Sequence, residues 1–549
     1  MINKPATKII LKVFACLALA VGAYFFATGL MDSVFAYRSP LKDNPPAPGR
    51  PLETALTRRV VFVLVDALRD DTSHNAQIMP YIAELRQQGA WATMHSRPPS
   101  YSEPGYTVLL TGAWPDLSDG PPINLDYEEI PTFTQDNLFS AAQRAGLKTA
   151  VSGYYWFEKL IPQGAVTASF YTPGEDQAAD RQVVDSASPW LDNPSYQLIL
   201  IHIDQVDYAG HYEGGPADPR WNAAAQRSDE LIREIAARLD FSQDTLVVLS
   251  DHGQIGRGGH GGQDAITLVE PFILTGAGVK PGQYPDIQMV DVAPTLAAML
   301  GANFPAPSQG HVRTEMVNFT SQQIQTIQSA LQEQQANLLS SFQVATGKEL
   351  PPVSTTGDPV DTHQAALEQA YSFSGLLGER LPRATLAFLV LALIGDSFYR
   401  MRGRSLAWML GGALLYLLLF NLRYAILDGR TYSLSSVLSA NELILYTAVT
   451  TVIALLVSWL VFSLGTKAFQ QSSTSAANAV LDGILVTIAL LALPVLWSYT
   501  VNGLFVTWRL PDFASMFLGF LSLLQILLVG AFGLLLAGIT ALVARLRHR

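Results

Sequence analysis

The chain has 549 residues, of which 49% are hydrophobic and 15% charged, and its formal net charge is −11. A chain of this length is expected to hold at least two domains, and its acidic balance gives no basic surface for nucleic acid, so we expect no nucleic-acid partner. Its single cysteine, Cys16, excludes a disulfide framework and a cysteine-based metal site.

The first apolar stretch is Ile9–Leu30, which is long enough to cross a bilayer. Lys4 and Lys8 precede it, and positive charges in this position favour a cytoplasmic amino terminus. Residues 1–36 are therefore predicted to form a membrane anchor. The alternative is a signal peptide, because Val34-Phe35-Ala36 is an acceptable cleavage site. Under both interpretations, the domain that follows is exported from the cytoplasm.

A linker over residues 37–57 leads into residues 58–318, where short β-branched stretches alternate with helical ones. This alternation predicts an α/β fold with a parallel sheet and helices on both of its faces. Each clear strand is nearly continuous in Val, Ile and Leu, as expected for a strand buried on both faces. The predicted strands are Val60–Val65, Leu147–Ser152, Tyr196–Ile203 and Thr245–Leu249.

Acidic and histidine side chains follow three of these strands. Asp66 comes directly after the first strand, Asp204 and Asp207 follow the third, and Asp251 and His252 follow the fourth. In an open α/β sheet, ligands bind beyond the carboxyl ends of the strands. We therefore expect three strands to deliver carboxylates and an imidazole to one edge of the sheet.

The rest of the chain is predicted to be helical. Residues 319–383 are expected to form a stalk, in which the glutamine-rich stretch Ser321–Phe342 is one helix. Residues 384–549 are expected to form a five-helix transmembrane domain, whose first apolar run is the weakest because it contains Asp396. The five apolar runs are Ala384–Phe398, Leu406–Leu427, Leu443–Leu464, Val480–Thr500 and Phe513–Val543.

Together with the anchor, these runs give six membrane helices with both termini in the cytoplasm. The α/β domain is then extracytoplasmic, in a periplasmic, extracellular or lumenal space. In this arrangement the positive charges that flank the helices fall on the cytoplasmic side, as the usual distribution of Lys and Arg predicts. These charges are Arg400, Arg402, Arg404, Lys467, Arg545, Arg547 and Arg549.

Arg423 and Asp482 are also charged residues inside apolar runs. The preferred interpretation is that they snorkel toward the membrane surface or pair with another helix. The alternative for Arg423 is that its guanidinium binds a lipid phosphate.

The candidate chemistry of the α/β domain lies in a set of carboxylates and imidazoles without thiolates, which suits zinc or manganese. Two such cations held a few ångströms apart can bind both the attacking and the leaving oxygen of an in-line displacement. Each motif alone is weak, since an Asp-His-Gly sequence is more often a turn. Asp204 either orients a histidine or is a strand-end cap, and the cap is preferred. The candidate ligands are Asp66, Asp207, His211, Asp251, His252 and His260.

The order and spacing of these residues resemble the alkaline phosphatase superfamily, and within it the type I phosphodiesterases and the GPI ethanolamine phosphate transferases. The resemblance covers Arg58–Val312 and implies an alkaline-phosphatase-like fold with two divalent metal ions, zinc in preference to manganese. It is carried by Phe62–Asp70, Gly89–Arg97, Pro99–Tyr106, Leu110–Gly112, Asp207–His211 and Asp251–His260.

The resemblance also implies a role for each residue. One metal would be bound by Asp207, His211 and His260, and the other by Asp66, Asp251, His252 and the nucleophile Ser102. Ser100 is the rival nucleophile, because members of the family often carry hydroxyls at both positions. Asn124 is a weaker candidate for binding the phosphate, since it lies one residue out of register.

A sulfatase is disfavoured. Sulfatases share the fold but make a formylglycine in a Cys/Ser-x-Pro-x-Arg context. The stretch from Ser102 to Tyr106 begins correctly but ends in tyrosine.

The preferred function is a membrane-bound phosphotransferase that moves a phosphoethanolamine-type head group from a phospholipid to a lipid-linked or glycan acceptor through a phosphoserine. Five carboxyl-terminal spans would be superfluous in a soluble phosphatase, which favours a lipid partner. The first alternative is a phosphodiesterase or phosphatase, because water and an acceptor hydroxyl use the same site. The second is a membrane protein with a degenerate catalytic domain, which the complete ligand set disfavours.

Overall fold

The computed structural model describes residues 5–354 and 356–547. The chain divides into two compact units. Among the described residues, the helical unit comprises residues 5–34, 377–506 and 511–547, and the sheet unit comprises residues 35–376 and 507–510. The short segment 507–510 connects two helices of the helical unit but belongs to the sheet unit.

The sheet unit is built on nine strands in the order β4-β3-β5-β1-β6-β7-β2-β8, with β9 paired to β2. The strands are β1 (Arg59–Val65), β2 (Ala90–His95), β3 (Lys148–Tyr154), β4 (Ala168–Thr172), β5 (Tyr196–Ile203), β6 (Asp244–Leu249), β7 (Val269–Gly276), β8 (Gly282–Gln283) and β9 (Ile287–Gln288). The four predicted strands are confirmed as β1, β3, β5 and β6. The predicted parallel sheet is mostly parallel, and β7 runs antiparallel to both β6 and β2.

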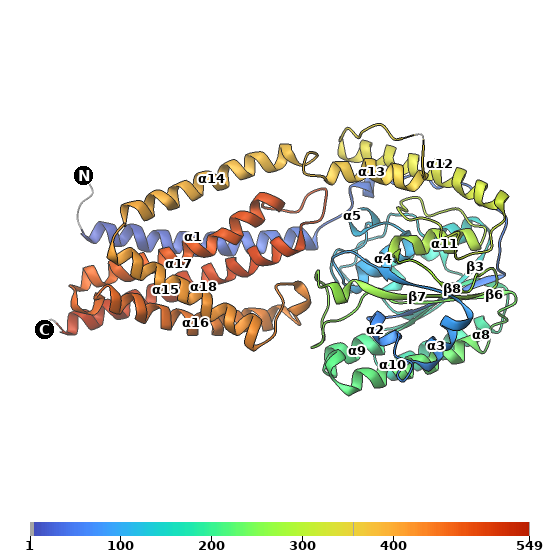
Figure 1. The fold of residues 1–549 in the computed structure, drawn as a ribbon, viewed down its shortest axis with the longest axis horizontal. Coiled ribbons are helices and arrows are strands. Elements are labelled where there is room, and N and C mark those ends of the chain that lie inside the picture. Colours follow the sequence, from blue (N-terminus) through green and yellow to red (C-terminus); the bar gives the residue numbers. More distant parts are fainter. Residues whose placement is uncertain (1–4, 355, 548–549) are drawn as a thin grey trace. The chain divides into compact units, whose positions relative to one another are not determined.

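Helices cover both faces of this sheet, as predicted (Figure 1). Val61, Val63 and Val65 point from β1 into a core that also contains Ile82 and Trp221 from the helices of one face. Burying each such aliphatic side chain contributes about 1.5–3 kcal/mol. The helices are α2 (Asp70–Ser73), α3 (Pro80–Gln88), α4 (Ser102–Thr111), α5 (Pro115–Ser118), α6 (Leu138–Arg144), α7 (Phe157–Leu160), α8 (Gln177–Leu191), α9 (Gln205–Tyr212), α10 (Pro219–Ala236) and α11 (Val292–Met299).

The segment expected to be a stalk lies within the sheet unit as far as Leu376. It forms α12 (Ser321–Thr346) and α13 (Pro359–Tyr371). Phe342 and Leu367 of these helices pack into a buried cluster with Leu41 and Leu117 of the same unit. The two helices are therefore part of a packed body rather than a free connection.

His311 joins α13 to the rest of the sheet unit. Its Nε2 atom lies 3.0 Å from Asp361 Oδ1 and 3.5 Å from Asp358 Oδ1, and its Nδ1 atom lies 3.7 Å from Asp291 Oδ1. Burial opposes the charged imidazolium, but the hydrogen bond to Asp291 and the charges of the three carboxylates raise the pKa of His311 above its ordinary value.

A pH-dependent stability follows from this raised pKa. The ion pairs of His311 stabilise the fold fully below the unfolded pKa of about 6.5, and the stabilisation is lost as pH rises through the folded pKa. The imidazole is partly exposed, so the effect is expected to be about 1 kcal/mol or less. We expect His311→Gln to lower the thermal midpoint of the sheet unit by about 1–2 °C near pH 6 and by less near pH 9. Tryptophan fluorescence during heating measures this, and a difference that grows with pH would contradict it.

The helical unit contains six helices that are long and apolar enough to cross a membrane, so the chain is an integral membrane protein. All six predicted apolar runs lie within these helices. The helices are α1 (Pro5–Phe35), α14 (Leu377–Arg400), α15 (Arg404–Asn421), which continues into a π-helical turn (Leu422–Leu427), α16 (Ala440–Gly465), α17 (Ser473–Asn502) and α18 (Phe513–Arg547).

α1 is packed into the core of the helical unit. Cys16, Ala23 and Ala27 lie in one buried cluster with residues of α15, α16, α17 and α18. The Lys12 Nζ atom lies 2.7 Å from Asp482 Oδ1. The interpretation of Asp482 as a helix-pairing charge is therefore confirmed.

Arg423 also has protein partners. Its Nε atom lies 3.5 Å from Asp428 Oδ2, and its guanidinium lies 4.9 Å from the ring centroid of Tyr446. These contacts favour pairing within the protein over a lipid phosphate as the main role of Arg423.

Candidate active site

The candidate site lies at the carboxyl ends of three neighbouring parallel strands, β5, β1 and β6. Asp66 follows β1, Asp204 follows β5, and Asp251 follows β6 after one serine. Because the strands are parallel, these carboxylates meet at one edge of the sheet. The strand-end pattern in the sequence predicted this convergence.

The first group of side chains consists of Asp66, Asp251, His252 and Ser102. The His252 Nε2 atom lies 3.4 Å from Asp66 Oδ1 and 3.4 Å from Asp251 Oδ2. The Ser102 Oγ atom lies 3.2 Å from the same nitrogen. The structure thus brings together four residues from three distant stretches of the sequence, and these residues were expected to share one metal.

The second group consists of Asp207, His211 and His260. Asp207 and His211 stand four residues apart on α9, and His211 Nε2 lies 3.4 Å from Asp207 Oδ2. The His260 Nε2 atom lies 3.5 Å from Asp207 Oδ1 and 3.0 Å from His211 Nε2. The rings of His252 and His260 stack with their centroids 4.0 Å apart, so the two groups are adjacent.

Two of the histidines are held in the tautomer that a metal requires. The Nδ1 atom of His252 lies 3.1 Å from the Gly253 carbonyl oxygen, and that of His260 lies 3.0 Å from the Ser100 carbonyl oxygen. A carbonyl only accepts hydrogen bonds, so each Nδ1 carries the hydrogen. The lone pair of each Nε2 then faces the carboxylates, which is how a backbone partner orients a metal-binding imidazole.

Two carboxylate oxygens of the first group, Asp66 Oδ1 and Asp251 Oδ2, are buried without a hydrogen-bond partner among the described residues. Leaving such an atom unpaired costs about 1–3 kcal/mol or more. A divalent cation between these oxygens and His252 Nε2 would compensate both. The donor set therefore fits a metal ion.

The electrostatics of the site agree with this fit. Burial and the negative charge of Asp66 raise the pKa of Asp251, and burial raises the pKa of Asp207. Burial and the nearby histidines His252 and His211 lower the pKa of His260. Crowded carboxylates beside neutral imidazoles are the environment that a bound cation stabilises.

Asp66 is oriented by two residues that the sequence reasoning missed. Its Oδ2 atom accepts a hydrogen bond from the Tyr106 hydroxyl and lies 3.1 Å from His202 Nε2. Burial alone would raise the pKa of Asp66, but the hydrogen bond from His202 and the charge of His252 lower it. Tyr106 lies one helical turn after Ser102, but no local pattern separates Tyr106 or His202 from a core residue.

Removing the Tyr106 hydroxyl is expected to weaken metal binding without removing a metal ligand. Tyr106→Phe leaves Asp66 Oδ2 with one donor instead of two, so the carboxylate is less firmly oriented. Loss of such a partner lowers metal affinity about 10- to 100-fold. Competition with a chromophoric chelator measures the affinity, with Tyr81→Phe on α3 as the control. Equal affinities of Tyr106→Phe and the wild type would contradict the role.

Ser102 stands at the amino terminus of α4, where backbone N–H groups favour an anion. The Asn124 side chain donates to Ser102 Oγ over 3.4 Å and accepts from the Glu103 backbone N–H over 3.0 Å. Asn124 therefore lies beside the candidate nucleophile in spite of its shift in register. At Gly105 a Cβ atom would come within 2.9 Å of Asp251 Cβ, so only glycine lets α4 approach the metal ligands this closely.

Ser100, the rival nucleophile, is occupied by structural hydrogen bonds. Its Oγ atom accepts from the Gly261 N–H over 3.0 Å and lies 3.0 Å from both the Gly262 carbonyl oxygen and Thr267 Oγ1. Its carbonyl also orients His260, as described above. Ser100 thus supports the loop that carries His260, and the geometry favours Ser102 as the nucleophile.

The preferred role of Asp204 is a strand-end cap, and the residue lies buried directly after β5. Asp204 occupies the N-cap position of α9, but its side chain makes no capping hydrogen bond. Its carboxylate instead lies close to Asp66 and His202, and burial together with the charge of Asp66 raises the pKa of Asp204. The backbone N–H of Asp204 donates to Asp180 Oδ1 over 2.8 Å.

The sequence of this region matches a known family. Residues 60–117 and 124–307 match the model for type I phosphodiesterase / nucleotide pyrophosphatase. The chain is 29% identical over 279 residues to the catalytic subunit of human GPI ethanolamine phosphate transferase 2, which covers 47% of this chain and 28% of that protein. It is 25% identical over 358 residues to mouse GPI ethanolamine phosphate transferase 1, covering 56% of this chain and 38% of that protein. The chain thus matches less than half the length of these relatives.

Two solved structures are similar in shape. Human ectonucleotide pyrophosphatase/phosphodiesterase 5 has a TM-score of 0.37 and 14% identity, over 44% of this chain and 95% of that one. The alkaline phosphatase PafA has a TM-score of 0.38 and 11% identity, over 49% of this chain and all of that one.

Proposed function

Since residues 60–117 and 124–307 match the family model for type I phosphodiesterase / nucleotide pyrophosphatase, we propose that the protein is a membrane-bound phosphotransferase. It moves a phosphoethanolamine-type head group from a phospholipid to a lipid-linked or glycan acceptor. The observation that carries this proposal is the position of Ser102, at a helix amino terminus and within 3.2 Å of His252 in a carboxylate-rich cluster. The similarity to GPI ethanolamine phosphate transferases supports the choice of head group.

In the first half-reaction, Ser102 Oγ forms a bond to the phosphorus of the lipid head group while the bond from phosphorus to the diacylglycerol oxygen breaks. The serine loses a proton and the leaving diacylglycerol gains one. Backbone N–H groups at the start of α4 and the Asn124 amide bind the phosphate oxygens. The products are diacylglycerol and a phosphoethanolamine ester on Ser102.

In the second half-reaction, a hydroxyl oxygen of the acceptor attacks the same phosphorus and the bond to Ser102 Oγ breaks. The acceptor loses a proton and the serine regains one, so the cycle balances. Water in place of the acceptor would give hydrolysis, which is the alternative function.

We propose Asp66, Asp251 and His252 as ligands of one divalent cation next to Ser102, and Asp207, His211 and His260 as ligands of the second. When bound, such cations lower the pKa of the serine hydroxyl and neutralise charge on the phosphate oxygens. Ligands without thiolate suit zinc or manganese. Tyr106 and His202 hold Asp66 in position.

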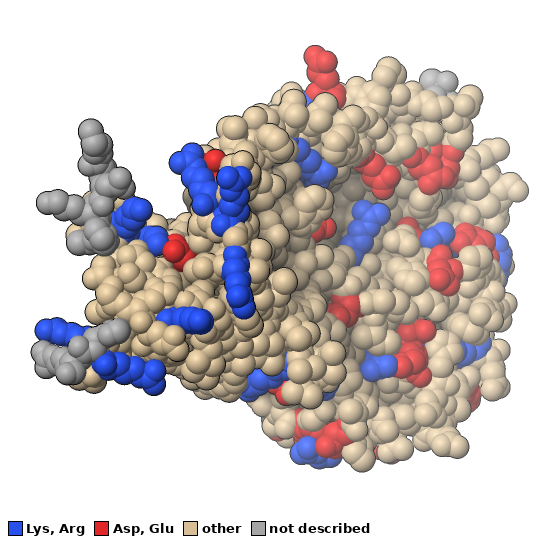
Figure 2. Space-filling view, turned by 60° about the vertical axis from the view of Figure 1, so that its left-hand side comes forward, with Lys and Arg blue, Asp and Glu red and all other residues tan. Residues whose placement is uncertain are grey.

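The sheet unit is proposed to be extracytoplasmic, with both chain termini in the cytoplasm. In Figure 2 most of the visible charged side chains of the helical unit are Lys and Arg, gathered toward the end where α1 begins and α18 ends. The sheet unit displays Asp and Glu together with Lys and Arg in the same view. A concentration of positive charge at one end of a membrane bundle supports a cytoplasmic position for that end.

The transfer reaction is tested with the full chain in nanodiscs that contain phosphatidylethanolamine labelled in its head group. The expected result is time-dependent transfer of label to a co-supplied glycolipid, together with release of diacylglycerol. Release of free phosphoethanolamine at the same rate with and without acceptor would favour the hydrolase. If the protein binds metal but forms neither labelled glycolipid nor free phosphoethanolamine, the result would favour the degenerate domain.

A further inference from the structure

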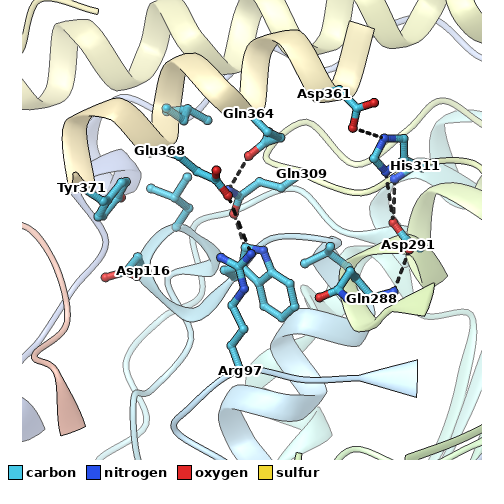
Figure 3. A pocket seen from close by; sticks show the side chains of 14 residues that line it. Arg97, Asp116, Gln288, Asp291, Gln309, His311, Asp361, Gln364, Glu368 and Tyr371 are labelled. Atoms are coloured by element: carbon cyan, nitrogen blue, oxygen red, sulfur yellow. Dashed lines mark hydrogen bonds and ion pairs between the residues drawn. The ribbon is translucent and has the colours of Figure 1, made fainter. Parts of the chain in front are cut away.

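The sheet unit contains a second cavity that is separate from the carboxylate and histidine cluster. Its volume is about 320 Å³, within the range of small-molecule sites. Arg97 precedes α4, Trp114 and Asp116 follow it, and Gln364 and Tyr371 come from α13 (Figure 3). None of the candidate metal ligands lines this cavity.

The charged side chains of this cavity already have partners. The Asp361 Oδ1 atom lies 3.0 Å from His311 Nε2, and Glu368 Oε1 lies 3.8 Å from Arg97 (Figure 3). Asp116 Oδ1 accepts a hydrogen bond from the Leu510 N–H over 2.5 Å. The paired carboxylates do not require a cationic ligand, and they repel an anionic one. The lining therefore suits a neutral polar molecule.

The uncharged polar side chains keep hydrogen-bonding capacity. Gln309 accepts from the Trp114 N–H and donates to Gln364 over 2.9 Å, and Gln364 donates to Gln335 over 2.8 Å. Gln309 and Gln364 thus each retain one N–H and one lone pair. The Tyr371 hydroxyl is buried without a hydrogen-bond partner among the described residues. These side chains offer both hydrogen-bond donors and acceptors. They therefore match a ligand that carries hydroxyl groups, because a hydroxyl group can donate and accept a hydrogen bond at the same time.

Aromatic rings complete the lining. Trp114 and Tyr371 both border the cavity, and the Arg97 guanidinium lies 4.3 Å from the Trp114 ring centroid. We propose that this cavity binds a neutral sugar residue of the acceptor glycan. The proposal rests on the transferase function above and gives that function an acceptor subsite.

The position of the cavity relative to Ser102 fits such a role. The catalytic serine begins α4, and Trp114 follows the end of this ten-residue helix, which is about 15 Å long. A sugar bound there would be remote from the hydroxyl that attacks phosphorus. Binding energy from a remote part of a substrate positions the reacting group. Changes in the cavity should therefore affect transfer to a glycan but not the cleavage of a small diester.

The test uses the full chain in nanodiscs and two variants that change the lining conservatively. Tyr371→Phe removes the unpaired hydroxyl, and Glu368→Gln removes the charge of a side chain that is 67% exposed. Tyr196→Phe, on β5 outside the cavity, is the matched control. Binding of mannotriose, maltotriose and cellotriose is measured by saturation-transfer NMR, and hydrolysis of bis(p-nitrophenyl) phosphate is measured in parallel.

We expect at least one trisaccharide to bind the wild type, and Tyr371→Phe to weaken it about tenfold, which corresponds to about 1.4 kcal/mol. Diester hydrolysis should be unchanged in both variants. Absence of binding by all three sugars at millimolar concentration, or equal binding by the wild type and both variants, would overturn the proposal.

The outcomes separate this proposal from the proposed function. Sugar binding does not require the nucleophile, so Ser102→Ala should bind the trisaccharide as the wild type does. Sugar binding without phosphoryl transfer in the wild type would leave the cavity assignment standing and refute the transferase. Transfer by the wild type that both cavity variants retain in full would support the transferase and refute the cavity assignment.

Discussion

Ser102→Ala is expected to lower the turnover of phosphodiester substrates by at least about a thousandfold. The hydroxyl is the group that bonds to phosphorus, and alanine at this position leaves only binding and polarisation of the substrate. Phosphorylated Ser102, detected by mass spectrometry after quenching the wild type with a slow diester substrate, should disappear in the variant. Metal content should remain near the wild-type value, since Asp66, Asp251 and His252 are untouched.

Ser100→Ala is the matched control, because it removes a neighbouring buried hydroxyl without removing the nucleophile. Its loss breaks the hydrogen bond from the Gly261 N–H and leaves that donor unsatisfied, at a cost of about 1–3 kcal/mol. A lower thermal midpoint with phosphorylated Ser102 still detectable is the expected outcome. If Ser100→Ala loses the phosphoserine and Ser102→Ala retains turnover, Ser100 is the nucleophile and Ser102 has the structural role.

Removal of divalent metal is expected to abolish turnover reversibly. After dialysis against a chelator, activity should return on addition of Zn²⁺ or Mn²⁺ and not with Mg²⁺, because imidazole ligands suit the transition metals. Asp251→Asn should show the same defect permanently, since the buried oxygen that lacks a protein partner loses its charge. Elemental analysis of the wild type should give about two ions per chain.

Stability gives a readout of metal binding that does not depend on activity. Metal at about 100 times its dissociation constant stabilises the folded state by about 2.7 kcal/mol, so the thermal midpoint of the wild type should rise when metal is added. Asp251→Asn should show a smaller rise, while Asp192→Asn, a surface change at a side chain that is 60% exposed, should match the wild type. A full complement of metal in Asp251→Asn would remove this residue from the ligand set.

Much of the sheet could be predicted because β1, β3, β5 and β6 are buried on both faces and are therefore continuous in apolar residues. β2 could not be found in this way. Its residues alternate between buried and partly exposed, and the stretch includes Trp91, Thr93 and His95. The antiparallel direction of β7 depends on its pairing with β6 and β2, which are distant in the sequence, so no local pattern reveals it.

The candidate site was predictable to a similar extent. Strand ends and family motifs indicated the residues that converge, because parallel strands bring their carboxyl ends together. Tyr106 and His202 were missed, since a tyrosine in an apolar helix and a histidine in a buried strand have the same local pattern as core residues. Their roles follow only from their shared contact with Asp66.

The ion pair between Lys12 and Asp482 constrains how the protein is made. α1 leaves the ribosome before residues 35–376 of the sheet unit, and α17 leaves after them, so this contact has very high contact order. During synthesis residues 35–376 of the sheet unit are made before α1 meets its partner, and domains generally fold in the order in which they emerge. Until then Lys12 is an uncompensated charge in an apolar helix. A chain that ends prematurely before α17 therefore lacks the carboxylate that pairs with Lys12.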